Sequence, residues 1–212
     1  VGMPHLGNRT YQEGDPVVPE DRGLERLPEN VDVRSYLRPT SDVVSLLVLE
    51  HQCRIHNLLH AAALNYRRAA WMERLLDPKS DLSRGSAVKI AEVHAAKIME
   101  AMFYSEEADL GDGVEGDATY QEDFRKLLPA TKDGGSLDDL RLLGRMMKLR
   151  CSHLVYSEAF QNLPDAVRIA VLKRMRRVLT TDESVTDFEY LKSKERREIH
   201  RILIETLPGY PG

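Results

Sequence analysis

The sequence predicts an all-α protein, and three observations lead to this expectation. From residue 41 onward, apolar residues recur at steps of three and four, which is the spacing of one face of an α-helix. Almost no segment shows the alternation of apolar and polar residues that is typical of a half-buried strand. Hydrophobic residues make up 42% of the 212 residues, which allows a substantial core at this length. We therefore expect an antiparallel bundle of four to five helices at residues 41–212, interrupted by a long acidic loop.

Residues 1–40 precede this helical domain and lack helical periodicity. They are rich in glycine and proline, which favours extended and turn conformations. Val31 and Val33 flank Asp32, so both valines would face the domain if this piece is extended. We expect an extended arm that lies over the surface of the helical domain, with a free tail as the alternative.

The first helix is expected to begin at Ser41, because serine is a favoured N-cap and Asp42 suits the positive end of the helix. It should end near Leu76, before Pro78. Leu46, Leu47 and Leu49 suggest that its first turns are buried on all sides. Its core-facing row is expected to comprise Val44, Val48, His51, Ile55, Leu58, Ala62, Asn65, Ala69, Met72 and Leu76.

The remaining helices follow from their apolar rows and their start signals. A second helix is expected over 83–104, and an acidic insert over 105–135. A third helix should span 136–160, because Ser136 with Asp139 three residues later resembles a capping box. A fourth should begin at Pro164 and reach residue 179. A last helix should run from Ser193 to residue 207.

The overall charge and the two cysteines exclude several kinds of protein. The formal net charge is -4, which gives no general attraction to nucleic acid. No stretch approaches the roughly 20 apolar residues of a membrane span. No CxxC or CxxCH motif occurs, which argues against a structural zinc site or a covalent haem within these residues. Cys53 and Cys151 either form one disulfide or remain as two buried free thiols.

The stretch EHQCRIHNLLH, residues 50–60, places polar residues around the middle of the first helix. At about 100° per residue, His51 falls on the core-facing row, whereas His56 and His60 share another face. These side chains either form a buried hydrogen-bonded network or bind a cofactor. His56 and His60 are four residues apart and would reach one metal ion, although this spacing is common by chance. We also considered that His94 or His153 faces His51.

The acidic insert contains carboxylates among glycines, which is the chemistry that calcium prefers. Its spacing does not match the EF-hand pattern, so a solvated loop is the default interpretation. The candidate calcium ligands are Asp109, Asp112, Glu115 and Asp117.

Three stretches together resemble a known group of proteins: PHLGN at residues 4–8, SDVVSLLVLEHQCRIHNLL at residues 41–59, and CSHLVYSEAF at residues 151–160. They are similar to the C-terminal half of exported, largely uncharacterised bacterial proteins related to c-type cytochromes. The resemblance implies a periplasmic or secreted location and a haem contact through His5, His51 or His56. Because this sequence lacks CxxCH, the covalent haem would belong to an upstream haem domain or to a cytochrome-like partner chain.

Two functions follow as hypotheses. The first is an extracytoplasmic helical domain of a cytochrome-c-like electron-transfer protein, which holds or adjoins a haem through histidines and sets its environment. The alternative is a non-catalytic helical structural or interaction module with a buried polar network. A metal-dependent enzyme that uses His56, His60 and a carboxylate is a third option. No motif names a substrate, so enzymatic activity is left open.

Overall fold

The computed structural model describes residues 10–12, 15–17, 34, 42–181 and 186–211. Most of the arm at residues 1–40, including His5, therefore lies outside the described residues, as does its predicted docking on the domain. Two short strands are described in the arm, β1 (Thr10–Gln12) and β2 (Asp15–Val17). They pair antiparallel, with Thr10 opposite Val17. All the other regular elements of the described chain are helices, which agrees with the predicted all-α class.

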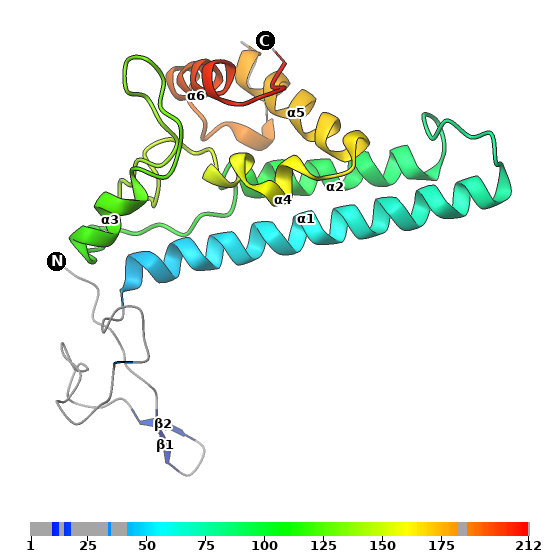
Figure 1. Cartoon of the computed structure of the whole chain (residues 1–212). Helices are drawn as coiled ribbons and strands as arrows, with labels where there is room; N and C mark the ends of the chain where they lie inside the picture. Colours follow the sequence, from blue (N-terminus) through cyan, green and yellow to red (C-terminus); the bar gives the residue numbers. More distant parts are fainter. Residues whose placement is uncertain (1–9, 13–14, 18–33, 35–41, 182–185, 212) are drawn as a thin grey trace.

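Helix α1 (Val43–Leu76) is the longest element of the described chain and runs along one whole side of the domain (Figure 1). Its N-cap is Asp42, whose side chain accepts a hydrogen bond from the backbone N–H of Ser45 at 2.8 Å. The predicted cap, Ser41, was therefore wrong by one residue. The helix ends at Leu76, as the sequence predicts, because Asp77 precedes Pro78 and a residue in that position is disfavoured in the helical conformation.

The inner face of α1 packs on α2 (Ser86–Met102), which runs back beside α1 (Figure 1). The predicted core-facing row is correct in the first half of α1 and wrong at its end, where Met72 and Leu76 are exposed. A strict seven-residue repeat drifts by about 20° per heptad on a straight helix, so the row leaves the core. The prediction that the first turns are buried on all sides was also wrong, because Leu46 is 50% exposed. The buried residues are Val44, Val48, Ile55, Leu59, Ala62 and Ala70.

The second half of the chain covers α2. Helix α5 (Asp165–Thr180) packs on α2, and α6 (Ser193–Thr206) packs on α5 (Figure 1). A 3₁₀ turn, η1 (His153–Tyr156), and the short α4 (Glu158–Gln161) approach α1. A second short 3₁₀ turn, η2 (Thr186–Phe188), precedes α6. Fully buried side chains from all these parts meet in one core, among them Phe103, Phe160, Met175, Leu191 and Ile199.

The expected third helix over 136–160 is not a continuous helix, which corrects the sequence prediction. Leu142 and Gly144 adopt left-handed backbone conformations, with φ of 58° and 67°. The segment instead pairs with the acidic insert: the N–H of Val114 donates to the carbonyl of Leu142 at 2.9 Å, and the N–H of Gly144 donates to that of Gly111 at 3.1 Å. Backbone groups that a helix would satisfy internally are thus satisfied by another segment.

The acidic insert is folded against the domain rather than solvated throughout. It contains α3 (Ala118–Phe124), which the sequence analysis did not predict. Asp117 caps this helix by accepting a hydrogen bond from the N–H of Tyr120 at 2.7 Å. Its last residue, Phe124, is buried in a second apolar cluster, and burial of such aromatic surface fixes the insert on the N-terminal turns of α1. The other buried members of this cluster are Val44, Val48, Tyr104, Leu110, Val114, Leu140, Leu142, Met146 and Met147.

None of the helices in the described part of the chain combines the length and the apolar character that a membrane crossing requires.

Replacing Ile98 with alanine should destabilise the domain by about 2–5 kcal/mol, because the side chain is fully buried in α2 and its removal leaves a cavity. Val93→Ala on the same helix is the matched control, since Val93 is 54% exposed and should change the free energy of unfolding by no more than about 0.5 kcal/mol. Urea unfolding measures both. Equal effects would contradict the described packing of α2.

Candidate functional site

One group of polar side chains converges inside the described domain, beside the N-terminal third of α1. It comprises His51, Gln52, Tyr104, Ser152 and His153, and we refer to it as the His51 cluster. The cluster joins three separate parts of the chain: the N-terminal third of α1, the end of α2 and the start of η1.

His51 points inward from α1 and makes two defined contacts. Its Nε2 atom lies 2.7 Å from the hydroxyl oxygen of Ser152. Its ring stacks on the ring of Tyr104, with centroids 4.3 Å apart and planes 15° apart. Ser152 is held in place because its backbone N–H donates to the carbonyl of Met102 at 2.8 Å. The cluster therefore couples α1 to the last turn of α2.

Tyr104 reaches His51 through an unusual helix end. Its backbone φ is 56°, a left-handed conformation that usually calls for glycine after a helix. The N–H of Ser105 donates to the carbonyl of Glu100 at 3.0 Å, and that of Tyr104 to the carbonyl of Ala101 at 3.1 Å. These are the two hydrogen bonds of a Schellman motif. A bulky residue in this conformation costs on the order of 1–2 kcal/mol, which burial of the stacked ring can offset.

His153 lies on the other side of the cluster. The side-chain amide of Gln52 lies 3.2 Å from its Nε2 atom and forms a hydrogen bond with it. The edge of the Phe124 ring meets the His153 ring at 82°, with centroids 5.1 Å apart. The suggestion that His153 faces His51 is confirmed, since their ring centroids are 6.3 Å apart. His94 instead lies 3.1 Å from the Asn65 amide.

Both imidazoles of the cluster are neutral at physiological pH. Burial, together with the nearby His153 and Arg54, lowers the pKa of His51 to about 3. Burial lowers the pKa of His153 to about 4. A general base works best when its pKa is near the operating pH, and the pKa of each imidazole is well below physiological pH. Ser152 is fully buried, so a substrate cannot reach its hydroxyl. The cluster therefore has the properties of a structural network.

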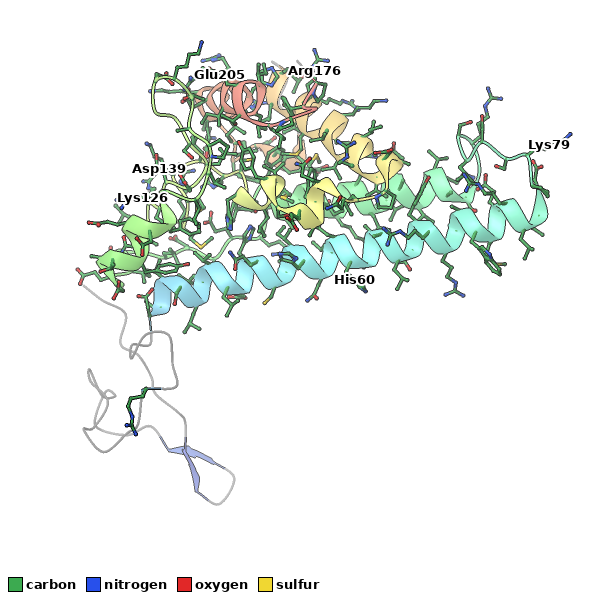
Figure 2. The ribbon with its side chains drawn as sticks, viewed as in Figure 1. His60, Lys79, Lys126, Asp139, Arg176 and Glu205 are labelled. Carbon is green, nitrogen blue, oxygen red and sulfur yellow. The ribbon has the colours of Figure 1, made fainter. Side chains whose placement is uncertain are left out.

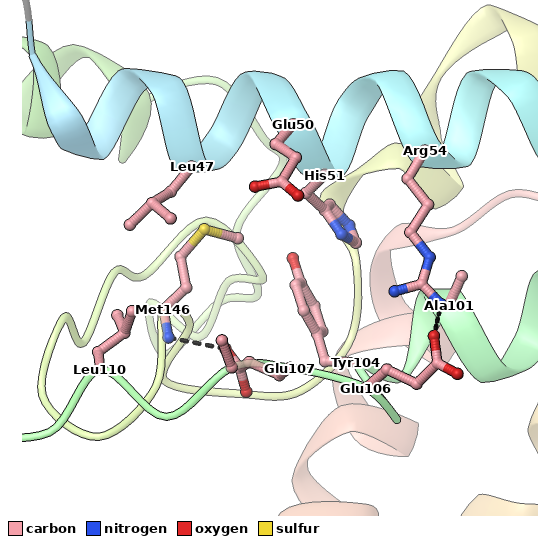
Figure 3. Close-up of a pocket in the computed structure, with 11 residues that line it drawn as sticks. Leu47, Glu50, His51, Arg54, Ala101, Tyr104, Glu106, Glu107, Leu110 and Met146 are labelled. Carbon is pink, nitrogen blue, oxygen red and sulfur yellow. Dashed lines mark hydrogen bonds and ion pairs between the residues drawn. The ribbon is translucent and has the colours of Figure 1, made fainter. Parts of the chain in front are cut away.

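A small pocket of about 160 Å³ opens beside the cluster (Figure 3). Its lining includes Leu47, Glu50, His51, Tyr104, Leu110 and Met146. Pockets that hold drug-sized ligands are roughly 300–1,000 Å³, and a haem needs at least that space. His51 also directs its Nε2 at Ser152 rather than into open space. The pocket beside the His51 cluster thus does not fit a haem.

The two other histidines of the helix centre are separated from the cluster. His56 and His60 are both exposed, and Figure 2 shows His60 on the side of α1 that is turned away from the other helices. Among the described residues, no group of three or more His, Cys, Asp or Glu side chains could hold a metal ion. The predicted metal pair therefore has no third protein ligand in this part of the chain.

The four predicted calcium ligands do not converge on one point, and two of them accept hydrogen bonds from backbone N–H groups instead. Asp109 accepts a hydrogen bond from the N–H of Gly111 at 2.9 Å, and Asp117 caps α3. Asp112 and Glu115 are exposed.

Of the two alternatives for the cysteines, free thiols are confirmed, with one difference from the expectation. Cys151 is buried, and burial raises the pKa of its thiol, whereas Cys53 is exposed on α1.

Sequence analysis missed three members of the cluster. No sequence signal marked Tyr104, because left-handed helix ends are expected at glycine. Gln52 and Ser152 stand next to His51 and His153 in the sequence, and this adjacency is the one signal that pointed toward them.

Comparisons of the chain with protein-family models, with curated proteins and with solved structures found no match. The resemblance to cytochrome-related proteins stays a prediction, and the function has to be argued from the geometry.

The stability of the domain should fall as the pH decreases from about 6.5 toward 4. The unfolded chain binds protons at histidine below pH 6.5, whereas the folded cluster stays neutral until its pKa values of about 3 and 4. Each buried histidine therefore contributes a slope of up to about 1.4 kcal/mol per pH unit in this range. His51→Asn or His153→Asn should reduce this slope in urea unfolding. His56→Asn is the exposed control, and an equal reduction there would contradict the assignment.

Proposed function

We propose that this chain is a non-catalytic helical interaction domain. In this proposal the His51 cluster fixes how the two halves of the domain meet, and the outer face of α1 binds a partner protein. The helices α1, α2, α5 and α6 would form the antiparallel bundle expected from the sequence.

A second apolar row on α1 carries the proposal. We call it the outer stripe. Its positions are separated by three, four, seven and eleven residues, so they lie in one row along the helix. Val48 and Ile55 of the inner face each follow an outer residue by two positions, which is about 200° around the helix. The outer stripe consists of Leu46, Leu49, Cys53, Leu64, Trp71 and Leu75.

The outer stripe is too exposed for an ordinary surface helix. Leu64 is 58% exposed, Trp71 63% and Leu75 62%. A surface helix normally has one apolar stripe toward the core and polar residues opposite. Single exposed apolar residues are common, but a row of them along one helix marks a binding surface. Tryptophan in particular is enriched at the centres of protein interfaces.

A second candidate keeps the cytochrome relationship. The imidazoles of His56 and His60 project from the exposed side of α1, and this favours contact with an iron held by a cytochrome-like partner chain or an upstream haem domain. The location would then be extracytoplasmic. An absorption spectrum of protein from its native source separates the candidates, since a Soret band lost in His56→Asn would favour this one.

The cysteines provide a direct test of the proposed binding surface. In purified, dilute protein a thiol reagent should modify Cys53, which is exposed in the outer stripe, and not Cys151, which is buried. In the native source, a bound partner should protect Cys53 from modification. Mass spectrometry of the modified peptides measures both sites in one sample. Equal modification of Cys53 in the two samples would show that the outer stripe is not covered, and the proposal would be wrong.

His51→Leu should keep the helical fold at a cost of about 1–3 kcal/mol, because the buried Ser152 hydroxyl loses its partner. Circular dichroism and urea unfolding measure this. The same variant should leave Cys53 protection in the native source unchanged, since His51 does not contribute to the outer stripe. Loss of a bound chromophore in His51→Leu would contradict the structural role of the cluster.

A further inference from the structure

We propose that the partner on the outer stripe is a second copy of this chain, with the two α1 helices packed antiparallel about a two-fold axis near His60. This inference rests on the proposed function, because it names the occupant of the same surface. Three features carry it: the positions of the apolar residues along the stripe, the positions of the charges beside it, and the repulsion that any parallel arrangement would create.

The apolar residues of the outer stripe are gathered toward its two ends. Leu46 and Leu49 lie near the N-terminus of α1, and Trp71 and Leu75 near its C-terminus. The midpoint of each matched pair, Leu46 with Leu75 and Leu49 with Trp71, falls at or beside His60. A two-fold axis there brings each end of one helix against the opposite end of its copy. The surface is therefore self-complementary, as a symmetric dimer interface must be.

Charged side chains beside the stripe fit the same arrangement. Glu50 and Arg68 are exposed and eighteen residues apart, which is five helical turns, so they flank the stripe on the same side. Within the described part of the chain, no ion pair involves either of them. The two-fold axis reverses the helix direction, and it places the same flank of the two stripes on the same side of the interface. Glu50 of one copy thus comes within about one turn of Arg68 of the other.

A parallel arrangement would place like charges against each other. Arg67 and Arg68 are both exposed and lie on opposite sides of the outer stripe. A parallel two-fold axis exchanges these sides, so Arg68 of one copy would face Arg67 of the other. Like charges across a helix pair are unfavourable, and charges beside an apolar row commonly set the orientation of the partner. The charges therefore select the antiparallel pair.

Sedimentation equilibrium tests for the pair directly. The protein should carry Cys53→Ser and the buffer should contain EDTA, so that neither a disulfide nor a metal held by His56 and His60 links the copies. We expect reversible association to a dimer, with a blue shift of the fluorescence of Trp71, the one tryptophan of the chain, as the concentration rises. Leu64→Glu should weaken the dimer by roughly tenfold or more, because it places a charge in the apolar row.

Leu127→Glu is the matched control for Leu64→Glu. Leu127 is 63% exposed, similar to Leu64, but lies after α3 and outside the outer stripe. It should leave the dimer unchanged. Circular dichroism should show the same helical content for both variants.

A charge exchange tests the orientation. Glu50→Arg and Arg68→Glu should each weaken the dimer by roughly tenfold, since each replaces two symmetric attractions with repulsions. The double variant Glu50→Arg/Arg68→Glu should restore most of the affinity. In a parallel pair the double variant would not recover, and that result would overturn the antiparallel arrangement.

Disulfide trapping locates the axis. His60→Cys in the Cys53→Ser background should form a disulfide-linked dimer on mild oxidation, because the two positions meet at the axis. Cys53 in the unmodified chain should not, since its two copies would lie about 22 Å apart along the helices.

The outcomes separate this inference from the proposed function. A mass of one chain at every concentration would overturn self-association through the outer stripe, as would a dimer that survives Leu64→Glu or that EDTA dissociates. If Cys53 is nevertheless protected in the native source, the outer stripe binds a different partner and the proposed function stands. If Cys53 is not protected there either, both are wrong.

Discussion

The packing of the inner face of α1 on α2 is the contact on which the rest of the structure depends. Helices gain most of their stability in proteins from the burial of an apolar face, and α1 is much longer than any other described element. Ile55 and Ala62 of α1 are fully buried and share one core with Ala91 and Ala95 of α2. Small residues let the two backbones come close. Helix α5 then packs on α2, and α6 on α5, so the order of contacts follows from this first pair.

The His51 cluster is a consequence of the same contact. Once the N-terminal third of α1 is covered by the end of α2 and by η1, the polar groups there lose water, and partners from the protein stabilise them. Ser152 supplies a partner for His51 and Gln52 supplies one for His153. The imidazoles stay neutral because burial disfavours their charged form. Hydrogen bonds have a defined partner and direction, which apolar contacts lack. In the proposed function, the cluster therefore fixes which residues of the irregular segment before η1 contact α1. This specificity explains why polar residues occupy buried positions that leucine could also fill.

The outer side of α1 obeys a different constraint. Nothing in the described fold covers Leu64 or Trp71, yet both belong to an apolar row that follows the helix. Helix α1 has two opposite apolar rows. One is buried within its own chain, and the other is exposed. The polar centre of the stripe around Asn57 and His60 limits nonspecific association, because a partner must match apolar ends and a polar middle at once. In the proposed function, the inner face of α1 thus contributes stability and its outer face contributes recognition.

The sequence by itself determined the helical class and the approximate extents of α1, α2, α5 and α6, because these depend on local periodicity, caps and prolines. It also placed His51 on the core-facing row of α1. The tertiary structure alone decided the rest. Segment 136–160 is not one helix, since its backbone pairs with the acidic insert, and no local pattern encodes such a partner. Tyr104 and Ser152 join His51 only because distant segments meet there. His56 and His60 are exposed because the core covers only one side of α1. A helical sequence with two apolar rows does not show which of the rows will be buried.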